Sequence, residues 1–159
     1  MIQNISDKDN WYFAYGSNLS KKQMLWRTGS VPSSKVASLA NYQFAFRKVL
    51  VGNDVFATIV PKQNSIVHGV LYRCSPHAML QLDHFEGVAE NCYRRESVHV
   101  TTRDGEHLSC VLYIGEAFTE NSAIPSASYW ELIRTGAQEH ELPVEYLHAL
   151  TKLAVVPNP

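Results

Sequence analysis

Strand-forming residues dominate the stretch from Val36 to Cys74, and this pattern decides the fold class of the chain. Over 42–47, aromatic residues alternate with other residues, which is the two-residue period of a β-strand. Residues 55–60 and 66–72 are rich in β-branched and aromatic side chains, which favour strands. The stretch therefore predicts a group of neighbouring strands.

A β-hairpin is predicted further along the chain. Two strand-like segments, 93–102 and 107–114, flank the dipeptide Asp104-Gly105. This dipeptide is typical of the tight turn between two antiparallel strands. The hairpin adds two more strands to the predicted sheet.

Residue patterns that are typical of helix starts lie mainly outside these strands. Residues 75–87 predict a helix with Ser75 as its N-cap, residues 128–131 form a capping box, and residues 143–152 predict a last helix. Strands outnumber helices and do not alternate regularly with them. The predicted class is therefore α+β, with a mainly antiparallel sheet.

Length and charge limit the classes of function that the chain can have. The chain has 159 residues, which predicts a single domain. It carries 14 Lys and Arg against 15 Asp and Glu, and it has no basic tract that would bind nucleic acid or an anionic membrane. No stretch approaches the roughly 18 apolar residues of a membrane-spanning helix. The expected partner is a small molecule or another protein.

The cysteines and the amino-terminal segment predict a cytoplasmic protein. Cys74, Cys92 and Cys110 are an odd set without a C-x-x-C pair, so neither a closed disulfide framework nor a zinc site is expected. Such cysteine usage suits a reducing compartment. Residues 1–10 are too polar for a signal peptide. We expect no bound metal.

The first candidate segment for ligand binding or catalysis follows the predicted strand at 11–15. Gly16 starts a tight loop, and a capping box at 20–23 begins a helix that ends near Gly29. Backbone amides ahead of a helix amino terminus favour a carboxylate or a developing oxyanion. The alternative is a plain strand-to-helix turn without a ligand.

The second such segment ends at Glu86. At the helical repeat, Glu86 shares a face with Met79 and Leu82, in the last turn of the predicted helix. Burial and the negative end of the helix dipole both raise the pKa of a carboxyl group at this place. A raised pKa suits a general acid/base near neutral pH. The alternative is that Glu86 only pairs with Arg94 or Arg95 on the next strand.

Together, the two segments resemble the γ-glutamylcyclotransferase family. The matching motifs are Phe13-Ala14-Tyr15-Gly16-Ser17-Asn18-Leu19 and, about 70 residues later, Leu82-Asp83-His84-Phe85-Glu86-Gly87-Val88 followed by Tyr93. The resemblance covers roughly residues 11–150. It implies one domain over 1–159 and a mixed, mainly antiparallel β-barrel flanked by helices.

The resemblance also implies the roles of the site residues. Glu86 would be the catalytic acid/base. The residues that would bind the γ-glutamyl moiety or line its pocket are Tyr15, Gly16, Ser17, Asn18, Leu19, Tyr93 and Tyr129. One position departs from the family pattern, because Asn91 stands where glycine is usual. Asn tolerates a left-handed backbone better than other non-glycine residues, so the turn can be retained.

The implied reaction uses no cofactor and no metal. The α-amine of a γ-glutamyl amino acid or dipeptide would attack its own γ-carbonyl and release 5-oxoproline, a lyase or acyltransferase reaction of glutathione metabolism. Two alternatives are a cyclotransferase for γ-glutamylamines or another γ-glutamyl metabolite, and a non-catalytic module that binds γ-glutamyl ligands. A monomer or a homodimer is expected.

Overall fold

The computed structural model describes residues 9–155. Residues 1–8, which make up most of the segment predicted not to be a signal peptide, lie outside the described residues, as do residues 156–159. Both ranges belong to the predicted single domain.

Five strands form a closed ring and a sixth extends it. The order of strands is β3-β1-β5-β4-β2-β6, and β2 also pairs with β3, which closes the barrel. The strands are β1 (Asn10–Ala14), β2 (Ser34–Val49), β3 (Val55–Cys74), β4 (Tyr93–Thr102), β5 (His107–Gly115) and β6 (Phe118–Ser122). The predicted barrel is confirmed.

The sheet is mixed, as predicted. Strands β1 and β5 are parallel, with Tyr12 opposite Val111, whereas all the other pairings are antiparallel. Residues Tyr12–Ala14 are buried, because β1 lies between β3 and β5 within the barrel wall. The aromatic run at the start of the chain is therefore a strand covered on both faces.

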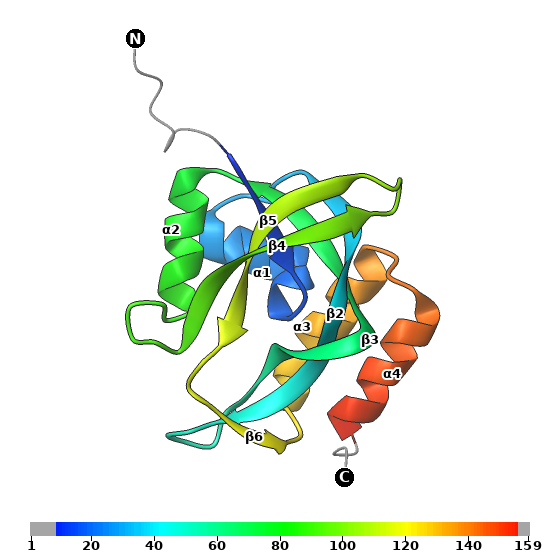
Figure 1. The fold of residues 1–159 in the computed structure, drawn as a ribbon. Helices are drawn as coiled ribbons and strands as arrows, with labels where there is room; N and C mark the ends of the chain where they lie inside the picture. The colour runs from blue at the N-terminus through cyan, green and yellow to red at the C-terminus, as the bar shows by residue number, and fades with distance from the viewer. Residues whose placement is uncertain (1–8, 156–159) are drawn as a thin grey trace.

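Helices pack around the barrel in two pairs (Figure 1). They are α1 (Lys21–Thr28), α2 (Pro76–Phe85), α3 (Ala127–Glu139) and α4 (Val144–Val155), and a single 3₁₀ turn, η2 (Ser17–Leu19), precedes α1. Helix α1 packs against α2, and α3 packs against α4. Serine N-caps begin α1 at Ser20 and α2 at Ser75, as the sequence predicts.

Three local expectations differ from the structure. The capping box at 128–131 was wrong, because the side chain of Ser126 caps α3 and the helix begins two residues earlier. The strands predicted at 55–60 and 66–72 are one continuous strand, β3, which is long enough to pair with both β1 and β2. Strand β6 was not predicted.

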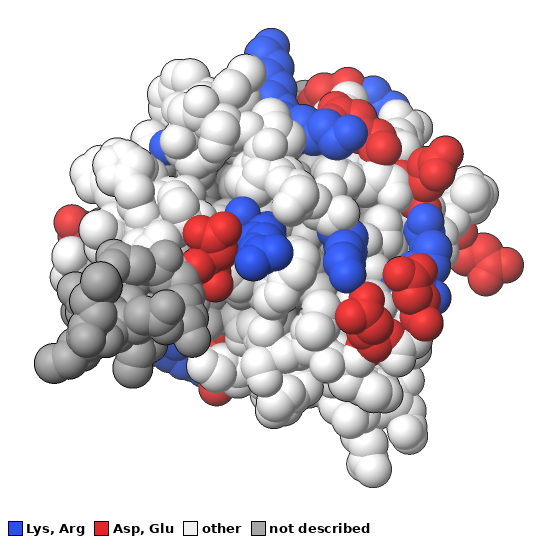
Figure 2. Space-filling model, turned by 90° about the horizontal axis from the view of Figure 1, so that it is seen from above, with Lys and Arg blue, Asp and Glu red and all other residues white. Residues whose placement is uncertain are grey.

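Charges of both signs are interspersed on the face of the molecule seen in Figure 2. Ion pairs within residues 9–155 include Lys35 with Glu106 at 2.9 Å and Arg94 with Glu96 at 3.0 Å. None of the helices within residues 9–155 is long and apolar enough to span a membrane.

Candidate active site

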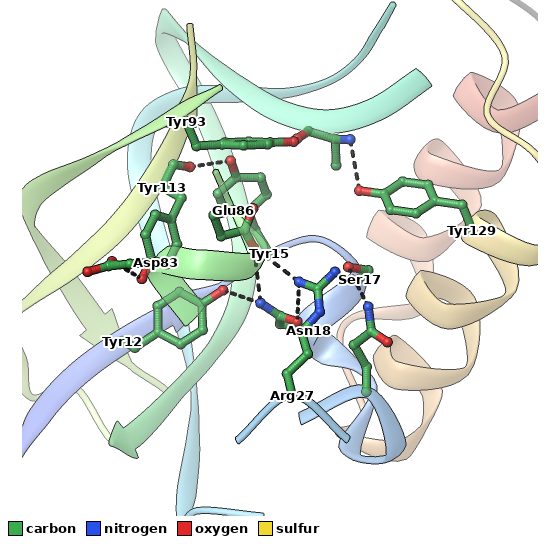
Figure 3. Close-up of polar contacts among 12 residues, drawn as sticks. Tyr12, Tyr15, Ser17, Asn18, Arg27, Asp83, Glu86, Tyr93, Tyr113 and Tyr129 are labelled. Atoms are coloured by element: carbon green, nitrogen blue, oxygen red, sulfur yellow. Dashed lines mark hydrogen bonds and ion pairs between the residues drawn. The ribbon is translucent and has the colours of Figure 1, made fainter. Parts of the chain in front are cut away.

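The loop after β1, the end of α2 and the start of α3 surround a cavity of about 130 Å³. All of the predicted site residues except Leu19 line this cavity. The residues that line it without having been predicted are Tyr12, Arg27, Phe56, Ala57, Phe85 and Tyr113. Segments far apart in sequence thus meet at one place (Figure 3).

Leu19 supports the loop from beneath. Its side chain is fully buried, and its N–H donates to the carbonyl of Gly16 at 3.0 Å. Its own carbonyl accepts a hydrogen bond from the Tyr72 hydroxyl at 3.2 Å. Helix α3 lies directly against it: a Cβ on Gly136 would come within 2.4 Å of the Leu19 carbonyl carbon. The Leu19 amide is therefore already engaged inside the protein.

Gly16 is needed for close approach rather than for a positive φ. Its φ is −110°, and a Cβ at this position would lie 3.3 Å from the Cβ of Ala57 and 3.7 Å from the Tyr129 hydroxyl. A side chain here would fill the space between the loop and the cavity wall. The glycine thus keeps the loop backbone open to the cavity.

Glu86 lies directly after α2, as its C-cap residue, and its side chain is only 15% exposed. Its Oε1 accepts hydrogen bonds from Arg27 Nη1 at 3.3 Å and from Asn18 Nδ2 at 3.3 Å. Within residues 9–155, Oε2 accepts no hydrogen bond. One carboxylate oxygen is thus anchored, and the other is free to exchange a proton.

The alternative partners of Glu86 are engaged elsewhere. Arg95 forms two hydrogen bonds of 2.7 Å with Asp83, and Arg94 pairs with Glu96. The hypothesis that Glu86 pairs with one of these two arginines is therefore wrong. The cation at the site is Arg27, from helix α1.

Burial controls the protonation of Glu86. The pKa of its carboxyl group is raised from 4.5 to about 7, mainly because burial removes the group from water. The positive charge of Arg27 and the Asn18 hydrogen bond lower this pKa, and the negative charge of Asp83 raises it, but burial is the larger effect. At neutral pH both forms of the group are populated, which is what a proton carrier requires.

Sequence reasoning missed Arg27. Its guanidinium also donates to Asn18 Oδ1 at 3.2 Å, so Asn18, Arg27 and Glu86 form a closed triangle of contacts (Figure 3). The only sequence signal is a basic residue in the last turn of the helix that follows the loop. Such a residue is also common as a solvated helix end, so the pattern does not identify it.

Two tyrosines hold the opposite wall of the cavity. The Tyr93 hydroxyl donates to the Ala57 carbonyl at 2.7 Å, and the Tyr129 hydroxyl accepts from the Ala57 N–H at 2.9 Å (Figure 3). A tyrosine hydroxyl can donate once and accept. Tyr129 therefore retains its proton to donate to a ligand, and Tyr93 retains acceptor capacity.

Other tyrosines connect the site to the barrel. Tyr12 accepts from Asn18 Nδ2 at 2.9 Å, Tyr15 donates to the Tyr113 carbonyl, and the Tyr113 hydroxyl donates to Asp83 at 2.7 Å. Burial raises the pKa of the Tyr12 and Tyr15 hydroxyls well above the usual value, so both are neutral at physiological pH.

The turn that follows Glu86 depends on left-handed residues. Gly87 has φ 62° and Asn91 has φ 58°. The expectation that Asn91 adopts the conformation usually supplied by glycine is confirmed. This turn brings the chain from α2 to β4 and so to Tyr93.

Residues 9–155 contain no group of three or more His, Cys, Asp or Glu side chains arranged to hold a metal ion. The polar groups that line the cavity are hydroxyls, amides, one guanidinium and one carboxylate. These groups can bind a polar substrate and move a proton.

The fold and the cavity define a class of protein. Residues 66–150 match the model of the AIG2-like family. Over 152 residues the chain is 32% identical to the human γ-glutamylcyclotransferase, an alignment that covers 92% of this chain and 79% of the human protein. The mouse γ-glutamylcyclotransferase is 33% identical, with the same coverage. The chain belongs to the γ-glutamylcyclotransferase family and is an enzyme.

Solved structures agree with this assignment. A γ-glutamyl cyclotransferase structure superposes with a TM-score of 0.84 at 30% identity, covering 96% of this chain and 89% of the other. A yeast γ-glutamyl cyclotransferase specific to glutathione superposes with a TM-score of 0.68 at 15% identity, over 92% of this chain and 96% of the other. The second similarity shows the shared fold alone.

Proposed function

We propose that the enzyme converts γ-glutamyl amino acids or dipeptides to 5-oxoproline and a free amino acid or peptide, with Glu86 as the general acid/base. The observation that carries this proposal is the state of Glu86: a buried carboxyl group of pKa about 7 with one anchored and one free oxygen, beside the Gly16 loop. No other carboxyl group lines the cavity within residues 9–155.

The proposed reaction balances without water or a cofactor. The α-ammonium of the substrate gives a proton to Glu86, and the freed amine nitrogen attacks the γ-carbonyl carbon. A tetrahedral intermediate forms, with negative charge on the former carbonyl oxygen. Protonated Glu86 then gives its proton to the departing nitrogen, and the bond between carbon and this nitrogen breaks. As the carbonyl forms again, the ring nitrogen gives its second proton to the Glu86 carboxylate, and Glu86 passes this proton to the released amine. The products are 5-oxoproline and an ammonium group on the departing amino acid or peptide, and Glu86 is a carboxylate again.

The rest of the site would fold the substrate. Bringing the amine and the carbonyl of a flexible chain together is worth an effective molarity of about 10⁵–10⁸ M in favourable cases. We assign this task to the loop Tyr15–Asn18, with Tyr129 donating to a substrate oxygen and Tyr93 accepting from the substrate ammonium. Binding of substrate analogues with and without the α-carboxylate would show whether the loop amides hold this carboxylate or the oxyanion.

The test is release of 5-oxoproline from γ-glutamyl-alanine, γ-glutamyl-ε-lysine and glutathione by wild type and by Glu86→Gln. Loss of the proton carrier should lower kcat by about 10²–10⁴-fold. Glu90→Gln is the matched control, because Glu90 is an exposed carboxylate four residues away that does not line the cavity. A Glu86→Gln variant as fast as wild type would refute the mechanism.

The same panel separates the alternatives. Turnover confined to γ-glutamyl-ε-lysine would indicate a γ-glutamylamine cyclotransferase. Binding of γ-glutamyl compounds without any release of 5-oxoproline would indicate a non-catalytic module, which has no need of a carboxyl group with a raised pKa.

We further propose that this lyase or acyltransferase chemistry acts on γ-glutamyl compounds of glutathione metabolism in the cytoplasm. The cysteines Cys74, Cys92 and Cys110 are all free thiols, as such a reducing compartment requires. A monomer or a homodimer remains our prediction for the oligomeric state, and sedimentation equilibrium would determine it.

A further inference from the structure

An exposed aromatic pair borders the cavity beside Glu86. Phe85 is 36% exposed, and among residues 9–155 the other side chains that line the cavity are buried or half-buried. The indole of Trp26, which is 71% exposed, lies against its ring with 5.1 Å between ring centroids. The pair joins the last turn of α1 to the last residue of α2. Two large apolar rings are thus held at the surface, and one of them, Phe85, lines the cavity that contains Glu86.

The walls of the cavity differ in how far they are covered. Tyr12, Tyr15 and Tyr113 are buried and form its inner end. Phe56, on the opposite wall, packs against Tyr129 at 5.2 Å and against Phe118 at 6.4 Å. The ring of Phe56 is therefore already covered. Phe85 remains 36% exposed although Trp26, His84 and Arg27 lie against its ring, so it offers an apolar surface at the mouth.

The proposed reaction places the departing group on this side. Proton transfer requires the departing nitrogen within about 2.6–3.2 Å of the Glu86 carboxylate. The side chain of a departing amino acid begins two bonds from that nitrogen. Since Phe85 and Glu86 line the same cavity, a substrate whose γ-glutamyl moiety occupies the buried end would place this side chain toward Phe85.

Building on the proposed function, we propose that Phe85 and Trp26 form the subsite for the departing group. This subsite favours γ-glutamyl compounds whose departing amino acid carries a large apolar side chain, an aromatic one above all. Arg27 fixes the orientation of the Phe85 ring, because its guanidinium carbon lies over that ring, 5.1 Å from the centroid.

The expected preference for an aromatic departing group follows from the energy of one aromatic contact. An aromatic pair formed on binding is worth about tenfold in kcat/KM beyond the effect of area alone. We expect γ-glutamyl-phenylalanine to exceed γ-glutamyl-glycine by about tenfold or more. The rings at the mouth discriminate between departing groups, whereas the buried end treats every γ-glutamyl compound alike.

The test compares this ratio of kcat/KM in wild type, Trp26→Ala and Trp26→Phe. Trp26→Ala should bring the ratio down by about three- to tenfold, and Trp26→Phe should retain most of it. Leu80→Ala is the matched control: Leu80 is 66% exposed and lies on α2, but it does not line the cavity. Its ratio should equal that of wild type.

The outcomes are distinguishable. If wild type releases 5-oxoproline from both substrates at equal kcat/KM, or if Trp26→Ala leaves the ratio unchanged, the subsite is overturned and the pair only packs α1 against α2. If wild type acts on neither substrate nor on the other γ-glutamyl compounds, the proposed function itself fails.

Discussion

At the scale of single residues, the pair formed by Arg27 and Glu86 decides the protonation of the site. Their nitrogen and oxygen atoms are 3.3 Å apart, and their side chains are 16% and 15% exposed. Burial favours the neutral acid, whereas the guanidinium favours the carboxylate. The two effects oppose each other, and the result is a pKa of about 7 rather than a higher one.

A pH profile tests this opposition. Since Glu86 must start as a carboxylate, kcat/KM of wild type should fall with unit slope below about pH 7. Arg27→Gln removes a charge that lowers the pKa of Glu86, so the acid limb should move to higher pH. For each pH unit by which the acid limb moves up, kcat/KM at a given pH on that limb falls about tenfold. An acid limb unchanged in the variant would show that Arg27 does not tune Glu86.

The same group should make the stability depend on pH. The folded-state pKa of Glu86 is raised from 4.5 to about 7, so its contribution to stability is present below about pH 4.5 and is lost as the pH rises through about 7. Glu86→Gln removes this dependence. The free energy of unfolding of the variant, relative to wild type, should therefore increase by roughly 3 kcal/mol between about pH 4.5 and pH 8.

Urea unfolding at several pH values measures this difference. Glu90→Gln, which changes an exposed carboxylate, is the control and should show no such trend. A difference between Glu86→Gln and wild type that stays constant with pH would mean that the carboxyl group is not buried as described.

At the scale of elements, α3 carries a site residue and depends on a cap that local pattern did not identify. Both Ser126 and Ser128 satisfy the pattern of an N-cap, and Ser128 even has a glutamate three residues later. The structure uses Ser126, whose side chain accepts from the Tyr129 N–H at 3.2 Å. This earlier start fits the long-range contact in which the Tyr129 hydroxyl meets the backbone of Ala57.

The two serines form a matched pair of variants. Ser126→Ala removes the cap and should lower the free energy of unfolding by about 1 kcal/mol. Ser128→Ala lies inside the helix at an exposed position and should change it by less than about 0.5 kcal/mol. Thermal or urea unfolding measures both. Equal effects, or a larger effect at Ser128, would contradict the assignment of the cap.

At the scale of the whole molecule, closure of the barrel ties the site together. Strand β3 pairs with β1 at one edge and with β2 at the other, so the barrel has no free seam between them. The loop with Gly16 follows β1, and Tyr93 begins β4. A barrel that opened would therefore separate the two sides of the cavity.

We predict that the chain unfolds as a single cooperative unit. Helices α1 to α4 pack on one closed barrel, and the large residues of the core form one cluster. Circular dichroism in the far and near ultraviolet should report the same midpoint, and Ser126→Ala should shift both together. Two separate midpoints would contradict the single domain predicted over 1–159.

Much of the site was predictable because the information is local. The apolar run at 11–15 with a glycine after it indicates a buried strand and a close turn. The helix at 75–87 predicts an acidic residue on an apolar face at its end, and Asn91 can take a left-handed φ without glycine. These features depend on residues within a few positions of each other.

What the sequence by itself determined is therefore most of the strands, most helix starts, the loop after β1 and the acidic residue at the end of α2. Only the tertiary structure decided its partners. Asn18 and Arg27 reach Glu86 across 68 and 59 residues of chain, and the arginines nearest in sequence pair elsewhere. Local periodicity reports which face a residue occupies. It does not report which other segment covers that face, because that follows from the closure of the barrel and the packing of α1 on α2.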